Sequence, residues 1–209
     1  RIEALELTQM KPIDEDGNIY KIVKIGSQIW MAENLKTTKY SNGSQIPKVS
    51  DNIAWTNLTT PGLCWYDNDS AFYANPYGAL YNWYVVESGS LCPTGWHIPT
   101  DAEWTLLSDY LGGSSTAGRK LKENGTTHWI SPNDCATNET GFTALPSGHR
   151  NPNPTNGLFY NIGETGRWWS SSEASIDNAY IRTLLYNDCG IGGSSFNKKF
   201  GLSVRCLKD

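Results

Sequence analysis

Apolar and polar residues alternate in four short runs, two near the start of the chain and two near its end. Alternation of this kind is typical of strands that bury one face. Gly26-Ser27 separates the first two runs and favours a tight hairpin turn. A polar stretch, residues 187–199, separates the last two runs and predicts a long loop. The predicted strands cover residues 19–25, 28–33, 178–186 and 201–207.

Two other segments have the spacing of three and four residues that predicts helices. Over residues 77–86 the apolar side chains share one face. Farther along, Thr100 and Glu103 have the spacing of a capping box, so we expect a helix that begins there and ends at Gly112-Gly113. A short helical turn is expected at residues 118–121. Turn-forming residues dominate two further stretches, which we expect to be irregular: residues 36–62 and 123–166.

The composition narrows the class of protein. Among 209 residues only 18% are charged, and the formal net charge is -4, which argues against a nucleic-acid-binding surface and against disorder. No run approaches the roughly 18 apolar residues of a membrane span, so none is expected. Neither a repeat nor an internal linker interrupts the chain. We therefore expect an N-terminal tail or linker over residues 1–13 and a single domain over residues 14–209.

The cysteines and the first residue both favour export. Five cysteines without a metal-type pair fit an oxidising compartment, although buried free thiols in a cytosolic protein are the alternative. The sequence opens at Arg1 without a methionine, so we expect a mature form from which a leader has been removed. These features together predict an extracellular or cell-surface protein.

Residues for catalysis are not grouped along the sequence. His97, His128 and His149 stand alone, without the spacing of metal ligands. No nucleophile-elbow, phosphate-loop or dinucleotide motif is present. A carboxylate pair that forms only in three dimensions stays open. We therefore expect a protein that is not an enzyme and that carries no cofactor.

One polar segment leaves a structural metal open. It is rich in side-chain oxygens and turn-forming residues, which hard cations prefer. A plain polar loop is the alternative interpretation. The candidate calcium ligands are Asn133, Asp134, Asn138 and Glu139.

The segment Leu91-Cys-Pro-Thr-Gly-Trp-His-Ile-Pro-Thr-Asp-Ala-Glu-Trp104 resembles the signature of the Fibrobacter succinogenes major paralogous domain. Further segments resemble the family in the same order along the chain, from about residue 14 to the end. They are residues 29–35, 77–83, 141–146, 168–173 and 201–206. Members are typically exported or lipid-anchored proteins of Bacteroidetes and Fibrobacteres, so the resemblance implies an exported lipoprotein or secreted protein.

Pro99-Thr-Asp-Ala-Glu-Trp104 is also similar to a segment of the sulfatase-modifying-factor family, whose scaffold is C-type-lectin-like. The resemblance implies an α+β fold with two helices, a small mixed antiparallel sheet and much irregular loop. The formylglycine-forming activity of that family does not carry over. Its enzymes use two nearby cysteines close to the C-terminus, whereas Cys189 and Cys206 are seventeen residues apart here.

The C-type-lectin-like resemblance also implies a disulfide between Cys92, before the second predicted helix, and Cys206, in the last predicted strand. Such a bond would attach the C-terminal strand to the helical layer. Cys64, Cys135 and Cys189 are then left, and only one further pair is possible among them.

C-type-lectin-like folds bind ligands through loops near their last strands, which correspond here to residues 168–200. Tyr and Arg among Ser, Gly and Asn are typical of contact loops that recognise proteins. The alternative is that the apolar members pack inward and residues 187–199 form a solvated loop. The candidate ligand-binding residues are Trp169, Ser175, Ile176, Asp177, Tyr180, Arg182, Leu184, Tyr186, Asp188, Ile191, Ser194 and Phe196.

A diversity-generating retroelement rewrites adenines near the 3′ end of its target gene, and the targets have C-type-lectin folds. Mutagenised AAY codons cannot encode Lys, Glu, Gln, Met or Trp. Between Ala174 and Phe200 only Lys198 and Lys199 fall outside the accessible set. That set is broad, yet Cys189 and the mixed apolar residues follow no periodicity, as expected of a diversified segment.

These observations predict a non-catalytic exported domain that presents a variable C-terminal face to a protein ligand on a cell, phage or host surface. A carbohydrate-binding adhesin module and a structural cell-surface domain are the alternatives. We expect a monomer with neither a nucleic-acid partner nor a membrane span.

Overall fold

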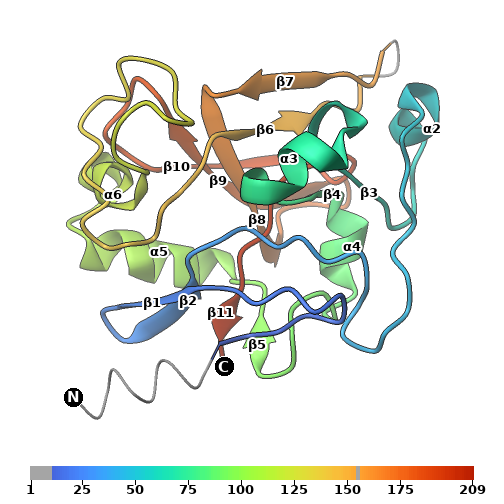
Figure 1. Cartoon of the computed structure of the whole chain (residues 1–209), viewed down its shortest axis with the longest axis horizontal. Coiled ribbons are helices and arrows are strands. Elements are labelled where there is room, and N and C mark those ends of the chain that lie inside the picture. The colour runs from blue at the N-terminus through green and yellow to red at the C-terminus, as the bar shows by residue number, and fades with distance from the viewer. Residues whose placement is uncertain (1–10, 154–155) are drawn as a thin grey trace.

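The fold is that of a computed structural model, which describes residues 11–153 and 156–209 (Figure 1). Most of the predicted tail, residues 1–10, lies outside the described residues. Ile13, which we had assigned to the tail, forms a bridge with Ile19. Short helices and several antiparallel sheets alternate along the chain, so the predicted α+β class is confirmed.

A four-stranded antiparallel sheet brings the two ends of the described chain together. Its strands follow the order β1 (Ile22–Ile25), β2 (Gln28–Met31), β11 (Leu207–Lys208) and β5 (Trp96–His97). β1 and β2 form the predicted hairpin, and Gly26 turns it with a φ of 60°. In Figure 1 the red arrow of β11 lies beside the blue hairpin.

A three-stranded antiparallel sheet dominates the C-terminal third. It contains β8 (Thr165–Glu173), β9 (Asn178–Leu185) and β10 (Gly192–Asn197), in the order β10-β9-β8. The predicted strand over residues 178–186 is confirmed as β9. The predicted loop over residues 187–199 is wrong in part, because it contains β10. That edge strand begins Gly-Gly-Ser-Ser, so no apolar alternation marks it.

Two further hairpins complete the strands. β3 (Leu63–Cys64) pairs with β4 (Leu80–Tyr81), and β6 (Ser147–Arg150) pairs with β7 (Phe159–Ile162). The predicted final strand is shorter than expected. Its first residues, 201–203, form single bridges to Arg150, Tyr81 and Trp168, because this buried run crosses three different neighbours rather than following one.

Five α-helices are described where the sequence predicted two. α5 (Asp101–Tyr110) confirms the second prediction, and both hydrogen bonds of its Thr100–Glu103 capping box are present. The predicted turn at residues 118–121 is the end of a longer helix. The remaining elements are α2 (Asn52–Thr56), α3 (Ser70–Tyr77), α4 (Trp83–Glu87), α6 (Ser114–Leu121) and the 3-10 turn η1 (Tyr66–Asn68).

The single helix predicted over residues 77–86 is wrong. α3 ends at Tyr77, and β4 follows before α4 begins. Gly78 adopts a φ of 82°, and a Cβ there would lie 2.7 Å from the Leu35 carbonyl oxygen. The Asn82 side chain then caps α4 by accepting from the Val85 N–H. The apolar residues over 77–86 have helical spacing, but Gly78 packs against the segment at Leu35 and prevents one continuous helix.

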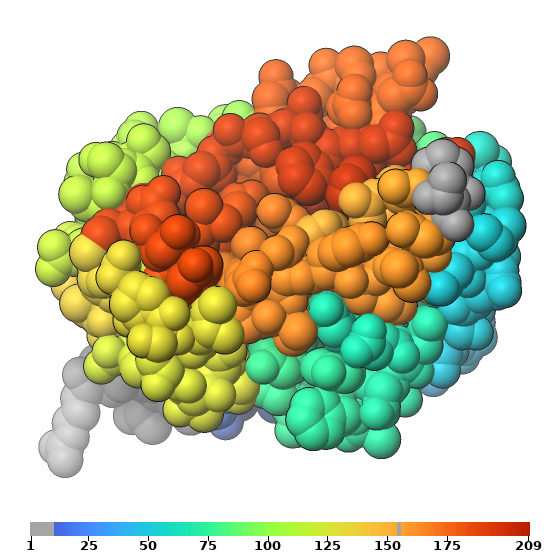
Figure 2. Space-filling view, turned by 90° about the horizontal axis from the view of Figure 1, so that it is seen from above, coloured from blue at the N-terminus to red at the C-terminus, as the bar shows by residue number. Residues whose placement is uncertain are grey.

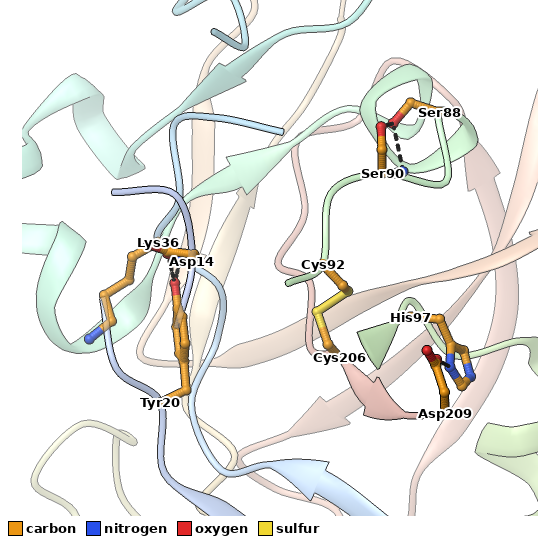
Figure 3. The surroundings of a disulfide bond; sticks show 9 residues. All are labelled: Asp14, Tyr20, Lys36, Ser88, Ser90, Cys92, His97, Cys206 and Asp209. Atoms are coloured by element: carbon orange, nitrogen blue, oxygen red, sulfur yellow. Dashed lines mark hydrogen bonds and ion pairs between the residues drawn. A yellow bond between two sulfur atoms is a disulfide. The ribbon is translucent and has the colours of Figure 1, made fainter. Parts of the chain in front are cut away.

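The predicted disulfide Cys92–Cys206 is confirmed, with an S–S distance of 2.00 Å (Figure 3). It joins the segment before β5 to the buried run before β11. Both cysteines belong to a hydrophobic cluster that also contains Trp169 and Ile181 of the three-stranded sheet. A second cluster contains Trp104 of α5, and it packs against the opposite face of the same sheet. β9 is therefore covered on both faces over much of its length.

Candidate functional site

The turn between β8 and β9 is the most exposed part of the predicted binding segment. Ser175 organises this turn, because its hydroxyl accepts from the Asn178 N–H at 3.2 Å. Ile176 at the tip is 86% exposed, more than any other large apolar side chain described. Asp177 is also exposed, and its carbonyl accepts from the Lys198 N–H. Figure 2 shows an orange segment projecting beside the red band that holds β10.

β9 and β10 extend this surface away from the turn. Tyr180 on β9 is 39% exposed and lies opposite Ser195 on β10. Ser194 is exposed as well, on an edge strand that pairs with β9 alone. We use the name rim for residues 174–177, Tyr180 and residues 192–195. The rim combines an apolar tip, a tyrosine and a small polar edge, with Tyr180 and Ser195 on one face of the sheet and Ser194, opposite Ile181, on the other.

The opposite end of β9 is fixed by covalent and ionic contacts. Residues 186–191, which we call the anchored loop, are held by a disulfide between Cys135 and Cys189. Lys122 is fully buried, and its ammonium donates to the carbonyls of Asp134, Leu185 and Asp188 at 2.8–3.0 Å. Burial lowers the pKa of Lys122 to about 8, against the opposing effect of nearby carboxylates. The sequence had left the pairing of Cys64, Cys135 and Cys189 open, and Cys64 is the buried free thiol.

The anchored loop also lies directly on α6. The Ile191 N–H donates to the Ser114 carbonyl at 2.7 Å, and the Arg119 N–H donates to the Cys189 carbonyl at 2.8 Å. A Cβ at Gly118 would lie 1.9 Å from the Gly190 carbonyl oxygen. Only glycine fits this approach. Cys189, Gly190 and Ile191 therefore have structural reasons for their identity, which corrects the interpretation that they follow no pattern.

Three candidate ligand-binding residues are buried, so their assignment as surface contacts is wrong. The Trp169 ring lies in the core, where its Nε1–H donates to the Tyr81 carbonyl at 2.8 Å. Leu184 and Ile191 belong to the cluster beneath α5 and α6. Alternation along β9 does not separate an inner from an outer face here, because clusters cover both faces.

Arg182 is also buried, and its role is to attach β9 to α5. Its guanidinium pairs with the Asp101 carboxylate and donates to the Thr105 hydroxyl at 3.0 Å. It also donates to the Asp101 carbonyl at 3.0 Å. With these donors occupied, Arg182 supports the sheet and is not presented to a ligand. Its assignment as a contact residue is corrected accordingly.

The three remaining candidates, Tyr186, Asp188 and Phe196, belong neither to the rim nor to the fully buried core. Tyr186 is half-buried against the second cluster. Asp188 is exposed, but its carboxylate accepts from the Gly190 N–H at 2.9 Å and so shapes the anchored loop. Phe196 is half-buried, with its ring 4.7 Å from Phe200 and the Arg167 guanidinium 5.2 Å from the ring centroid. All three are tied to the scaffold: Tyr186 and Asp188 belong to the anchored loop, and Phe196 follows the rim residues on β10.

The model of the Fibrobacter succinogenes major domain matches residues 23–208, which include both β9 and the disulfide partners described above. The chain belongs to the Fibrobacter succinogenes major domain family. The comparison with curated proteins and the comparison with solved structures found no match. The family match therefore covers the rim and its supports together, but it assigns no ligand to either.

The three histidines of this family member each have a charged partner, which their isolation in the sequence did not predict. His97 lies between the carboxylates of Asp209 and Glu103, at 2.6 and 3.0 Å. Burial alone would lower the pKa of His97, but these two hydrogen bonds raise it. Figure 3 shows His97 against Asp209, close to the Cys92–Cys206 bond.

The candidate calcium ligands have separate partners. Asn133 donates to the carbonyls of Glu123 and Gly125, the Asn138 side chain bonds to Thr143, and the Glu139 carboxylate pairs with Lys120. Over residues 11–153 and 156–209 no three His, Cys, Asp or Glu side chains are grouped as metal ligands. In the same ranges no helix is long and apolar enough to cross a membrane.

Sequence reasoning missed part of the rim. Ser195 is exposed beside Tyr180, and Ala174 and Gly193 are exposed as well. The strand β10 was read as loop, so nothing placed Ser195 opposite a known position on β9. The only signal was the exposed Gly-Gly-Ser-Ser composition itself, which resembles the small polar residues of contact loops.

Proposed function

We propose that this chain is a non-catalytic, exported binding domain that recognises a protein ligand through its rim. The observation that carries the proposal is the exposed pair of Ile176 and Tyr180 at the free end of an anchored sheet. Apolar tips and tyrosines supply most of the binding energy in protein interfaces, and small polar neighbours adapt to the partner. The two disulfides fit an oxidising compartment and so support export.

The separation of binding and folding also supports the proposal. Rim side chains at the turn bond within the turn, as Ser175 does with Asn178. Core packing in the same sheet is supplied by other residues, such as Ile181 and Leu184. Substitution on the rim would therefore change recognition while leaving the core intact. A C-type-lectin-like scaffold, monomeric in solution, is part of the same proposal.

We further propose that a diversity-generating retroelement varies the rim. Its positions are coded within the accessible codon set and lie outside the core. The buried residues of the anchored loop would be excluded from productive variation. A near-identical, adenine-rich template copy beside a reverse transcriptase gene is the expected genomic finding. Its absence from the genome would remove the retroelement from the proposal without affecting the binding role.

A displayed library tests the binding role. Residues 175–177, Tyr180 and Ser194 would be randomised with the AAY-derived set, and binders would be selected against hen lysozyme as a model protein ligand. We expect enriched variants with a Kd of about 1 μM or tighter, or roughly 8 kcal/mol of binding free energy. A matched library on the exposed face of α5, at Leu106, Asp109 and Tyr110, is the control. Equal or no enrichment from the rim library would contradict the proposal.

Carbohydrate recognition is the alternative that the rim chemistry also allows, because an exposed Tyr180 ring can stack on a sugar. A glycan array probed with the unmodified chain and with Tyr180→Ala separates the two. The protein-ligand proposal predicts no glycan signal above background. A glycan signal that Tyr180→Ala abolishes would replace it with the adhesin role.

A further inference from the structure

A cavity of about 380 Å³ lies apart from the rim, where five chain segments meet. It is bounded by β1, the residues after β2, the end of α3 and the segments around residues 128 and 141–145. Figure 2 shows the yellow segment around residue 130 lying against the green segment of α3. Its volume falls in the range of small-molecule sites, roughly 300–1,000 Å³. Its apolar lining includes Ile22, Val23, Ala32, Pro76 and Leu145.

One wall of the cavity contains His128, whose ring is held by the Glu123 carboxylate. His128 Nδ1 lies 2.8 and 2.9 Å from the two Glu123 carboxylate oxygens. The Glu123 carboxylate therefore occupies Nδ1, and Nε2 is the ring nitrogen left without this partner. The pair is only partly exposed, 25% for His128 and 17% for Glu123. The Tyr77 ring packs edge-on against His128 at 5.5 Å and limits its movement.

Another wall contains the Glu33 carboxylate. One oxygen, Oε2, accepts from the Lys21 N–H at 2.9 Å, so the position of the side chain is fixed while the carboxylate stays half-buried. Lys21 itself is exposed, and water therefore screens its ammonium more than it screens the carboxylate. Lys21 also lines the cavity, so the more buried charges there are the carboxylates of Glu33 and Glu123, beside one exposed ammonium.

The floor of the cavity is shaped by backbone that is held in an unfavourable conformation. Thr143 has a φ of 53°, which is rare for a β-branched residue. The Asn138 side chain holds it there, accepting from the Thr143 N–H at 2.8 Å and donating to its hydroxyl at 3.0 Å. The buried Arg205 also donates to the Thr143 carbonyl. Strain maintained by several contacts is characteristic of binding sites.

From this geometry we infer that the cavity binds a small organic ammonium compound with an apolar body. The ammonium donates to the Glu33 carboxylate, beside the Glu123–His128 pair, and the apolar body lies against Val23, Ala32 and Leu145. An anion is disfavoured because the two more buried charges at the cavity are carboxylates, and a purely apolar ligand would cover part of the Glu33 carboxylate without offering it a donor. The inference shares no residue with the rim, so it stands or falls independently of the proposed function.

A titration with three molecules of one shape tests the inference. Phenethylamine, 2-phenylethanol and 3-phenylpropionate share the apolar body and differ in charge. Amide chemical shifts of the whole chain would be followed by NMR. We expect phenethylamine to bind with a Kd of about 1 mM or tighter and the other two at least about tenfold more weakly. The largest shifts should lie at Val23 and Gly141 and not on the rim.

Two variants test whether the negative charge of Glu33 binds the ammonium. Glu33→Gln keeps an oxygen for the Lys21 N–H and removes the charge, so we expect at least about a tenfold loss of phenethylamine affinity with an unchanged urea midpoint. Glu139→Gln, which removes an exposed carboxylate paired with Lys120, should leave the Kd within about twofold. Binding of 2-phenylethanol as tight as that of phenethylamine would overturn the inference, and so would the absence of saturable binding by the unmodified chain.

Discussion

The two ends of β9 differ in how many structural contacts their residues make with the rest of the protein. At the anchored loop, one disulfide, one buried ammonium and one glycine contact fix six residues against α6. At the rim, Ile176 is exposed on a short turn and Tyr180 is exposed on β9, beside the edge strand β10. The difference teaches that composition alone does not mark a binding surface. Gly, Asp, Tyr and Ile occur at both ends, but the Ile and Tyr of the rim are exposed, whereas Ile191 is buried and Tyr186 half-buried in the anchored loop.

Among the contacts of the anchored loop, we expect the Cys135–Cys189 disulfide to contribute most to the free energy of unfolding. Replacing both Cys135 and Cys189 by alanine releases a loop of 54 residues, and in the chain-entropy model this lowers the free energy of unfolding by about 4 kcal/mol. Urea unfolding followed by tryptophan fluorescence measures the loss. Cys64→Ala, which removes the free thiol, serves as the matched control. A double variant as stable as the unmodified chain would mean that the loop is not anchored by this bond.

The buried ammonium of Lys122 should have the second-largest effect on the free energy of unfolding. Lys122→Met leaves three carbonyls without their donor in a site closed to water, and we expect a loss of about 3 kcal/mol. Lys120→Met, two residues earlier in α6, removes an exposed ion pair with Glu139 and should cost less than about 1 kcal/mol. Comparable losses in the two variants, measured by urea unfolding, would show that Lys122 has no special role.

The glycine contact tests how closely the loop lies on α6. In Gly118→Ala the new methyl group meets the Gly190 carbonyl, so the loop must move, and we expect a loss of about 2 kcal/mol despite the better helix propensity of alanine. Ser115→Ala, at an exposed position of the same helix, should be neutral or slightly stabilising. Gain of stability in Gly118→Ala would contradict the close approach.

The rim should give the smallest effect. Ile176→Ser combined with Tyr180→Ser removes two exposed side chains, and we expect a change in the free energy of unfolding within about 0.5 kcal/mol. Thermal melting followed by circular dichroism is sufficient to measure it. A loss above about 2 kcal/mol would show that the rim carries structure, and the contrast between the two ends would then disappear.

Local signals in the sequence predicted those elements that depend on local chemistry. The Thr100–Glu103 capping box located the start of α5, and the alternation about Gly26-Ser27 located the first hairpin. The family resemblance supplied the Cys92–Cys206 bond, which no spacing could have given. Each of these is visible within one segment or within one family motif.

What the sequence did not predict depends on contacts between distant segments. Leu184 and Tyr180 point to the same face of β9, because they are four residues apart on the strand. The helices α5 and α6 cover Leu184 but leave Tyr180 exposed. Arg182 looks like a surface residue until Asp101, far away in sequence, provides its partner. β10 has too few apolar residues to be recognised as a strand, because its neighbour β9 supplies the pairing. Sequence reasoning therefore identified a segment that is exposed in part, but it did not separate the exposed residues of that segment from the buried ones.

We propose that recognition depends on the rim and that folding depends on the anchored loop. The most direct measurement is saturation mutagenesis of residues 174–197 with resistance to protease as the measure of folding. The account predicts that Ser175, Ile176, Tyr180 and Ser194 accept nearly all substitutions, whereas Cys189, Gly190 and Ile191 accept few. Uniform tolerance along the whole segment, or a rim as intolerant as the anchored loop, would contradict it.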